Sequence, residues 1–313
     1  MELAALAAVV VSVTAVARAR ARKERRLAGV DATTGVDNAL LAVLYRYRSA
    51  FGLAARHHFF LDWRFVHVNH GSFGVMPRAV CRARAEAEAG IEAFPDDFFR
   101  RHALRRYREV ADAVAAYVRA PPGSVALVDN ATSGVNSVLR GLALGPGDAF
   151  LISDNTYRAC ANAVHDVASR SGATVIEMAF ELPPASAAAL TDALAAALDA
   201  HPSVRVALVD HITSPTGLVM PVASMVAAAH ARGVRVLVDG AHAPLQLDLD
   251  VGALGADWYT GNLHKWAFAA KGCALLYTAP AHAAGQQGLA VSHFWKRDYV
   301  SRFYMQGTRD YAG

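Results

Sequence analysis

The sequence predicts an α/β fold with a mostly parallel, seven-stranded sheet that carries helices on both faces. From about residue 64 onward, seven short apolar runs alternate with longer, alanine-rich amphipathic runs. Strands that are apolar throughout are buried on both sides, as happens when helices connect parallel strands. Hydrophobic residues form 54% and charged residues 19% of the 313-residue chain, which excludes a disordered chain and fits an α/β protein.

The expected elements follow one another in simple alternation. The short apolar runs predict strands at Val125–Val128, Ala149–Ile152, Thr174–Met178, Val204–Val209, Val234–Val238, Trp258–Tyr259 and Ala274–Tyr277. The amphipathic runs between them predict helices at Gly134–Leu142, Arg158–Ser171, Ala187–Ala200 and Val222–Arg232. No repeat of fixed period appears, so we expect a single layered domain rather than a solenoid.

The chain divides into an amino-terminal extension, residues 1–60, and one large domain, residues 61–313. In the extension, Leu3–Ala17 is almost entirely apolar, and a dense basic run follows it. A stretch of about 15 residues is short for a membrane span, which needs ~20. Positive charge after the stretch favours a weak membrane anchor with the large domain on the cytosolic side. An organellar leader or an extension without assigned role is the alternative.

Charge and cysteine content restrict the partners and the compartment. The net charge of +4 comes largely from the basic run of the extension, so we expect no nucleic-acid partner. The three cysteines are widely separated and lack CxxC spacing, which predicts neither disulfides nor zinc but a reducing, cytoplasmic or organellar compartment. Histidines do not stand beside carboxylates at ligand spacing, so no metal site is expected. Motifs for serine hydrolysis and nucleotide binding are absent from the sequence.

Polar clusters follow four of the predicted strands directly. They are Asp129–Gly134, Ser153–Tyr157, Asp210–Gly217 and Asp239–His242. The carboxyl ends of parallel strands meet at one edge of the sheet, and ligands of such sheets bind there. We therefore expect the functional site at this edge.

Two residues predict the chemistry of that site. Asp239 follows the buried strand Val234–Val238, and Lys265 lies in the segment GNLHKW after the strand Trp258–Tyr259. An acid at a strand end and a later lysine form the arrangement that holds pyridoxal phosphate (PLP). The lysine forms a Schiff base with its aldehyde, and the carboxylate keeps its pyridine nitrogen protonated. The neighbouring aromatic residues predict a desolvated lysine with a lowered pKa. Taken singly, a surface lysine and a turn-forming aspartate are the plainer interpretations.

Further residues at the same edge are expected to contact the cofactor. Thr132 and Ser133 lie where a helix begins, and the free N–H groups of a helix start suit a phosphate. A plain helix cap explains one of these hydroxyls equally well. The other candidates are Asn262 and His264 for the phosphate, Tyr157 for the face of the ring, and His242 and Ser214 for the ring hydroxyl.

Five segments together resemble a known family. They are NHGSFG at 69–74, DNATSG at 129–134, DHITSPTG at 210–217, DGAHA at 239–243 and YTGNLHKW at 259–266. In this order they resemble the class V, fold-type I PLP enzymes. Within these, the chain is most similar to the isopenicillin N epimerase-like branch, which includes plant-type L-cysteine desulfhydrases and hercynylcysteine sulfoxide lyases. The resemblance runs from about Phe65 to the end of the chain.

The resemblance implies roles for individual residues. Lys265 and Asp239 match the catalytic pair, and residues 61–313 match the PLP-binding large domain of the fold-type I enzymes. Gly307-Thr308 matches a segment that reaches the phosphate of the neighbouring subunit, so a homodimer is expected with Thr308 as a cofactor contact. Asn69–Gly74 matches a stretch that borders the substrate pocket. Relatives continue into a small carboxyl-terminal domain, which we expect to be missing from this chain.

The resemblance also implies the activity. We expect a PLP-dependent enzyme that acts on a small amino-acid substrate, as a C–S lyase of the cysteine desulfhydrase or hercynylcysteine sulfoxide lyase type. An epimerase of the isopenicillin N type or an aminotransferase is the alternative, because all three reactions start from loss of the same proton. A truncated PLP-binding protein without catalytic activity is a further alternative.

Overall fold

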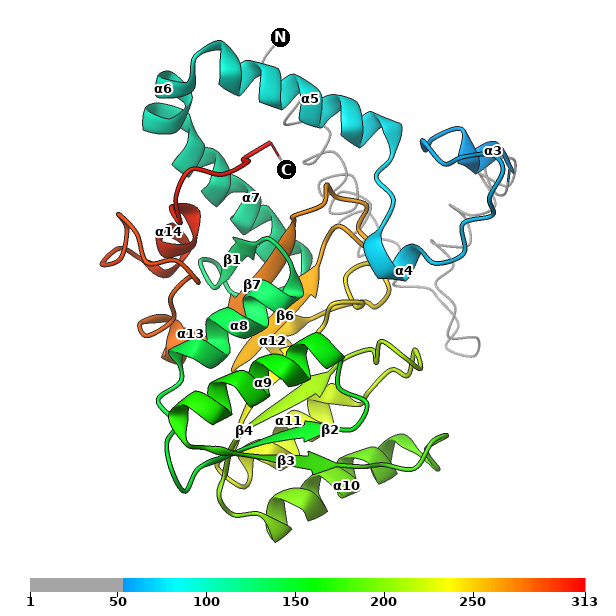
Figure 1. Cartoon of the computed structure of the whole chain (residues 1–313), viewed down its shortest axis with the longest axis vertical. Coiled ribbons are helices and arrows are strands. Elements are labelled where there is room, and N and C mark those ends of the chain that lie inside the picture. Colours follow the sequence, from blue (N-terminus) through cyan, green and yellow to red (C-terminus); the bar gives the residue numbers. More distant parts are fainter. Residues whose placement is uncertain (1–52, 313) are drawn as a thin grey trace, which may run out of the picture.

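A computed structural model of the chain describes residues 53–312 (Figure 1). Its strands are β1 (Val125–Val128), β2 (Ala149–Ser153), β3 (Thr174–Met178), β4 (Val204–Asp210), β5 (Arg235–Asp239), β6 (Trp258–Asn262) and β7 (Ala274–Thr278). They form one sheet in the order β1-β7-β6-β5-β4-β2-β3. All pairings from β6 across to β3 are parallel, and β7 lies antiparallel between β6 and β1. The predicted seven-stranded, mostly parallel sheet is confirmed.

Helices cover both faces of this sheet. The described helices are α3 (Leu53–Arg56), α4 (His70–Phe73), α5 (Arg78–Ala93), α6 (Pro95–Asp97), η3 (Phe98–His102), α7 (Ala103–Tyr117), α8 (Ala131–Gly141), α9 (Arg158–Ser171), α10 (Ala187–Ala200), α11 (Val222–His230), α12 (Val251–Leu254), α13 (Pro280–Ala283) and α14 (Tyr299–Tyr304). One apolar core joins the sheet to α8, α9 and α14, and the other joins it to α10, α11 and α12. Helix α7 contributes to both cores, whereas α5 extends away from the sheet (Figure 1).

The alternation of side chains along the strands produces the two cores. In β5, Val236 and Val238 point to one face and Leu237 to the other, and all three are fully buried. Each such side chain contributes about 1.5–3 kcal/mol through removal of apolar surface from water. Between Arg235 at its start and Asp239 at its end, β5 has only apolar side chains, so Asp239 is the polar group that the strand brings to its carboxyl end.

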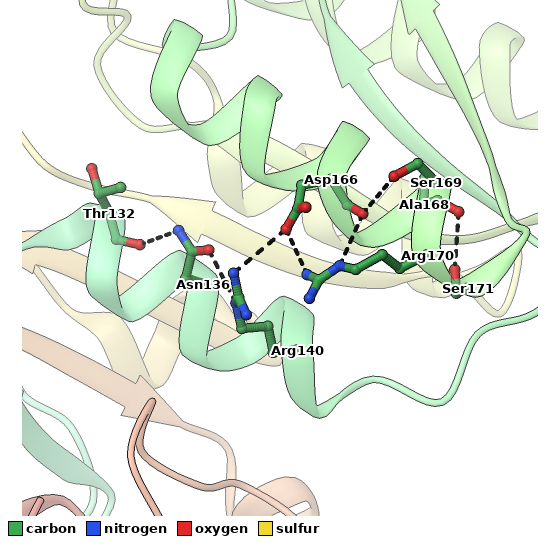
Figure 2. Close-up of polar contacts among 8 residues, drawn as sticks. All are labelled: Thr132, Asn136, Arg140, Asp166, Ala168, Ser169, Arg170 and Ser171. Carbon is green, nitrogen blue, oxygen red and sulfur yellow. Dashed lines mark hydrogen bonds and ion pairs between the residues drawn. The ribbon is translucent and has the colours of Figure 1, made fainter.

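Helices α8 and α9 lie side by side on one face, and both start at the carboxyl edge of the sheet. Asp166 of α9 lies between Arg140 of α8, at 3.5 Å, and Arg170 of its own helix, at 2.5 Å (Figure 2). All three side chains are about half exposed, so each pair contributes up to about 1 kcal/mol. Of these two ion pairs, only that of Arg140 with Asp166 joins the two helices, because Arg170 and Asp166 both lie on α9.

Several helix and strand boundaries differ from those predicted. Helix α8 begins at Ala131 rather than Gly134, because the side chain of Asn130 caps it. Strands β4 and β6 continue to Asp210 and Asn262, since hydrogen bonding to neighbouring strands extends beyond the apolar residues. The sequence also predicted no helix in the regions of α5 and α7, where arginines interrupt the apolar pattern.

The predicted amino-terminal extension lies almost entirely outside the described residues, and the candidate anchor Leu3–Ala17 does so completely. Within residues 53–312, no helix combines the length and the apolar character that crossing a membrane requires.

Candidate active site

Asp239 lies at the carboxyl end of β5 and is 3% exposed. The thiol of Cys160 donates to its Oδ2 at 3.1 Å, and the N–H of Ala241 donates to its Oδ1 at 2.9 Å. Burial raises the pKa of Asp239, while these two hydrogen bonds and the charge of Lys265 oppose the rise. The fold thus holds an acid in an apolar surrounding at the edge where the sequence predicted a ligand.

Lys265 lies three residues beyond β6, and its amine points to the loop after β5. Its Nζ atom is 3.1 Å from Nε2 of His242. Burial lowers the pKa of Lys265, and the nearby charge of Asp239 partly restores it. The main chain is also held, because Nε2 of His70 contacts the carbonyl oxygen of Lys265 at 2.8 Å. The desolvated amine that the aromatic neighbours predicted is therefore present.

His242 contacts two residues of the GNLHKW segment. Besides the contact to Lys265, its Nδ1 accepts a hydrogen bond from the indole of Trp266 at 3.4 Å. Burial is the main cause that lowers the pKa of His242, to about 4. The imidazole is therefore neutral at physiological pH.

The segment Asn69–Gly74 packs directly against residues His264–Trp266, the lysine turn. A Cβ on Gly71 would lie 3.0 Å from Cζ2 of Trp266, and one on Gly74 would overlap the carbonyl oxygen of His264. Gly74 also has a φ of 68°, which side chains disfavour. Glycine is thus required where this loop meets the site, and its predicted place beside the substrate pocket stays a prediction.

Two asparagine side chains accept hydrogen bonds from backbone N–H groups at the start of α8. The side chain of Asn130 accepts from the N–H of Ser133 at 2.8 Å, and Oδ1 of Asn262 accepts from the N–H of Ala131 at 2.9 Å. The carbonyl of Thr132 is held by Nδ2 of Asn136 at 3.0 Å (Figure 2). Because its oxygen is committed to the helix, Asn262 can offer a phosphate only its amide Nδ2.

A hydrogen bond to the main chain also restricts what His264 can offer a phosphate. Its Nδ1 lies 3.0 Å from the carbonyl oxygen of Cys273, which can only accept, so Nδ1 carries a proton. In the neutral ring Nε2 is then an acceptor. Burial lowers the pKa of His264, and the positive charge of Lys265 adds to the effect. The predicted role as a phosphate donor is therefore open only to the protonated ring.

In the part of the chain that the structure describes, three predicted residues make no hydrogen bond to Lys265, Asp239 or His242. Tyr157 caps α9, is 44% exposed, and its N–H donates to Oδ1 of Asp210 at 3.5 Å. Ser214 is exposed in the loop after β4, and Thr308 is exposed near the end of the described chain. Within residues 53–312, no hydrogen bond joins Ser214 or Thr308 to the other predicted site residues. Their predicted roles stay untested.

The structure adds two residues that the sequence analysis missed. Asp210 is the register partner of Asp239 and is 5% exposed; burial, and then the charge of Asp239, raise its pKa to about 8. Cys160 lies on α9 and is fully buried against Asp239. Asp210 opens a polar segment at a strand end, which was a usable signal. Nothing in the sequence around Cys160 indicates its position.

A cavity of about 350 Å³ adjoins the start of α8 on the side of Ser133. Arg309 lines it and pairs with Asp129 at 2.9 Å, and Gln306 lines it from the carboxyl-terminal segment. Arg309 is a further residue that the sequence analysis missed. It places a cation beside the turn that was predicted to bind phosphate.

Comparison with known sequences identifies the family. The profile of the aminotransferase class-V family matches residues 97–288, which include α7 to β7 and the residues Cys160, Asp239, His242 and Lys265, but neither the segment Asn69–Gly74 nor Arg309. The chain belongs to the aminotransferase class-V family. The predicted family is therefore confirmed. This family is PLP-dependent.

Individual class-V relatives agree with the predicted branch. The chain is 38% identical over 261 residues to putative L-cysteine desulfhydrase 1 of Oryza sativa subsp. japonica, covering 78% of this chain and 54% of that protein. It is 35% identical over 240 residues to isopenicillin N epimerase of Streptomyces clavuligerus, covering 76% and 59%. The chain therefore spans little more than half the length of these relatives.

Solved structures share the class-V fold. The cystine C–S lyase C-DES in complex with cysteine persulfide superposes with a TM-score of 0.67 at 25% identity, over 78% of this chain and 68% of that one. The cysteine desulfurase CsdA of Escherichia coli superposes with a TM-score of 0.66 at 22% identity, over 84% and 69%. The predicted fold class is thus confirmed.

Proposed function

We propose that this chain binds PLP through Lys265 and Asp239 and acts as a C–S lyase on a cysteine-type amino acid. The observation that carries the proposal is the position of the Lys265 amine, 3.1 Å from His242 and within the electrostatic reach of the buried Asp239. A half-buried lysine near a buried acid at a strand end is costly for stability, and such perturbed groups are concentrated at functional sites.

The residues present fit PLP. Asp239 accepts hydrogen bonds only from a thiol and a backbone N–H, and within residues 53–312 no cationic side chain hydrogen-bonds to it. A protonated pyridine nitrogen would supply the missing positive partner. The residues that would hold the remaining groups of PLP are Lys265 for the aldehyde, Thr132, Ser133, Asn262, His264 and the partner's copy of Thr308 for the phosphate, Tyr157 for the ring face, and His242 and Ser214 for the ring hydroxyl.

When bound, PLP supplies an electron sink for negative charge at the α-carbon of an amino acid. The chain's own groups then handle protons and orientation. Nζ of Lys265 removes the α-proton of the substrate and can return it, which requires the neutral amine that burial favours. Asp239 would stay ionised against the pyridine nitrogen, and the segment Asn69–Gly74, which contains α4, packs against the lysine turn.

The cofactor proposal is tested by borohydride reduction of the PLP-treated full chain, followed by peptide mass spectrometry. We expect a phosphopyridoxyl group on Lys265 and none in the Lys265→Ala variant. Lys271, which lies in the loop before β7 and contacts the carbonyl oxygen of Gly74 at 3.4 Å, is the matched control. An adduct at Lys271, or at no lysine, would contradict the proposal.

The C–S lyase reaction is supported by the named relatives. The Oryza sativa relative is called an L-cysteine desulfhydrase, and the C-DES structure is called a cystine C–S lyase. With L-cysteine we expect equal amounts of pyruvate and sulfide. An epimerase is the second candidate, because the Streptomyces clavuligerus relative carries that name. Inversion of the α-carbon without pyruvate would favour the epimerase. A keto acid that retains the substrate's side chain would indicate an aminotransferase, and a Lys265 adduct without turnover would indicate a PLP-binding protein without catalytic activity.

We also propose that residues 61–313 form the PLP-binding domain of a homodimer in a reducing compartment. Phe60, Phe65 and Phe73 are 64%, 66% and 76% exposed. They lie in or shortly before the segment Asn69–Gly74, which packs against the lysine turn, and exposed apolar surface marks interfaces. The three cysteines are free, as a reducing compartment requires. Light scattering of the purified chain tests the dimer, and a monomeric mass at micromolar concentration would contradict it.

A further inference from the structure

Three side chains form a hydrogen-bonded row at the lysine turn. The indole Nε1 of Trp266 is 3.4 Å from Nδ1 of His242, and Nε2 of the same imidazole is 3.1 Å from Nζ of Lys265. The three groups are half-buried, and the row joins the loop after β5 to the segment after β6. Each contact restricts where the protons of the next group can be.

The first contact determines the state of the imidazole. An indole nitrogen can only donate a hydrogen bond, so Nδ1 of His242 must offer a lone pair to Trp266. An imidazolium has no lone pair, which excludes the protonated ring. The neutral ring must then carry its single proton on Nε2.

The second contact determines the state of the amine. Nε2–H of His242 is a donor, and an ammonium group has three donors and no acceptor. The 3.1 Å contact is a hydrogen bond only if Lys265 is the neutral amine and accepts the proton of His242. We propose that Trp266 is a positioning residue that fixes the proton of His242 on Nε2 and thereby presents Lys265 as a free amine.

Other groups around Lys265 favour its charged form, so a fixed proton on Nε2 of His242 matters for keeping the amine neutral. Asp239 at the end of β5 and Cys160 on α9 both favour the ammonium form. Burial opposes them because it disfavours the charged form, and neither His242 nor His264 can supply a negative charge that would favour the ammonium. Without the fixed proton on Nε2, the imidazole could turn a lone pair towards the lysine and add a third influence in favour of the ammonium.

The indole is itself held in place. The ring of His70 packs on Trp266 with 5.2 Å between ring centroids, and Gly71 leaves no room for a side chain between the loop and the indole. A tautomer device requires a donor that cannot rotate away, and this packing supplies one.

The protonation states are a property of the chain alone, whereas the use of the free amine rests on the proposed function. The first experiment therefore uses the full chain without cofactor. Nitrogen-15 labelling of the 13 histidines and two-dimensional NMR distinguish Nδ1–H from Nε2–H rings, and the His242 signals are assigned by their loss in His242→Gln. We expect the Nε2–H form in the wild type. An Nδ1–H ring or an imidazolium near neutral pH would overturn the inference, whether or not PLP binds.

The second experiment measures the rate at which Lys265 captures PLP, by borohydride trapping and peptide mass spectrometry, as a function of pH. Trp266→Phe keeps an aromatic ring but removes the N–H donor. Trp295→Phe is the matched control, because Trp295 is 54% exposed and its ring contacts the amine of Lys296. We expect Trp266→Phe to move the rate profile upward by about one pH unit, which makes capture at pH 7 roughly tenfold slower.

The outcomes separate this inference from the proposed function. If the wild type forms no adduct at Lys265 at any pH, the proposed function fails. If the adduct forms with the same pH profile in the wild type and Trp266→Phe, the function stands and the role of Trp266 is wrong. If Trp266→Phe does not fold, which thermal unfolding would show, the wild-type NMR result alone decides the inference.

Discussion

Asp210 and Asp239 are register partners at the carboxyl ends of the adjacent parallel strands β4 and β5, and both carboxyl groups are buried. Two buried acids on neighbouring strands repel one another when both are ionised. The thiol of Cys160 donates to Asp239, and the N–H of Tyr157 donates to Asp210. The pair can therefore divide its roles, with Asp239 ionised against a cation and Asp210 protonated beside it.

Asp239→Asn should weaken PLP binding roughly tenfold to a hundredfold. The variant removes a charge-assisted hydrogen bond of about 1.5–3 kcal/mol to the pyridine nitrogen. It should leave the fold at least as stable as the wild type, because it also removes a buried carboxylate whose pKa is raised. Equilibrium binding of PLP and urea unfolding measure the two effects.

Asp257→Asn is the matched control for Asp239→Asn. Asp257 precedes β6 at the opposite edge of the sheet, where it accepts from Nε2 of His230 and His282 and from the N–H of Val236. Burial acts to raise its pKa, but these hydrogen bonds outweigh it and lower the pKa. We expect a loss of about 3 kcal/mol of stability and unchanged PLP affinity. If the two variants behaved alike, Asp239 would be a structural residue.

Asp210→Asn should change the pH dependence of stability. The folded-state pKa of Asp210, about 8, lies above its unfolded value, so the folded state holds the proton more tightly. The wild type therefore loses stability through this group as pH rises from about 4 to about 8, by up to about 1.4 kcal/mol per pH unit. The variant lacks this loss and should gain stability relative to the wild type between pH 5 and pH 8. Urea unfolding at pH 5 and pH 8 measures this gain. The same stability difference between variant and wild type at both pH values would contradict the raised pKa of Asp210.

Gly74→Ala should destabilise the fold by roughly 2 kcal/mol or more. The backbone of Gly74 has φ 68° and ψ 159°, a combination restricted to glycine, and a Cβ would overlap the carbonyl oxygen of His264. Gly90→Ala is the control, because Gly90 lies in α5 with open space around its Cα and should gain about 1 kcal/mol. Urea unfolding measures both changes. A neutral Gly74→Ala would mean that the loop does not pack on the lysine turn.

Asn130→Ala should lower both stability and PLP affinity. The side chain caps α8 at the turn predicted to bind phosphate, and loss of a helix cap costs about 1 kcal/mol. Ser186 caps α10 in the same way through the N–H of Ala189, but α10 lies on the other face of the sheet. Ser186→Ala should cost a similar stability and leave PLP affinity unchanged. Equal affinity in both variants would remove the α8 turn from the cofactor site.

Local sequence predicted the seven strands well because most of them are short apolar runs that fit a buried strand; the edge strand β3, which contains Thr174 and Glu177, is the exception. It was less successful where tertiary pairing decides. Asn262 belongs to β6 because it pairs with Ala274 of β7, although asparagine has a low strand propensity. Helices α5 and α7 were missed because their arginines mask a narrow apolar stripe.

The candidate site shows the same division. Lys265 and Asp239 could be identified because a strand end and a short polar motif are local patterns. The contact of Cys160 with Asp239 joins residues 79 positions apart, and no local sequence pattern predicts it. The row from Trp266 through His242 to Lys265 also depends on two loops meeting, and only their meeting determines the tautomer and the charge.

The order of apolar and polar residues by itself determined the layered α/β fold, the edge of the sheet that carries the polar groups, and the lysine and acid expected to hold PLP. The tertiary structure alone decided which groups act on one another: Asp239 on Asp210 through its charge, and Trp266 on His242 and His242 on Lys265 through hydrogen bonds. The physical reason is one of range. Secondary structure follows from neighbours in the chain, whereas a protonation state follows from every dipole and charge within a few ångströms, whatever segment supplies it.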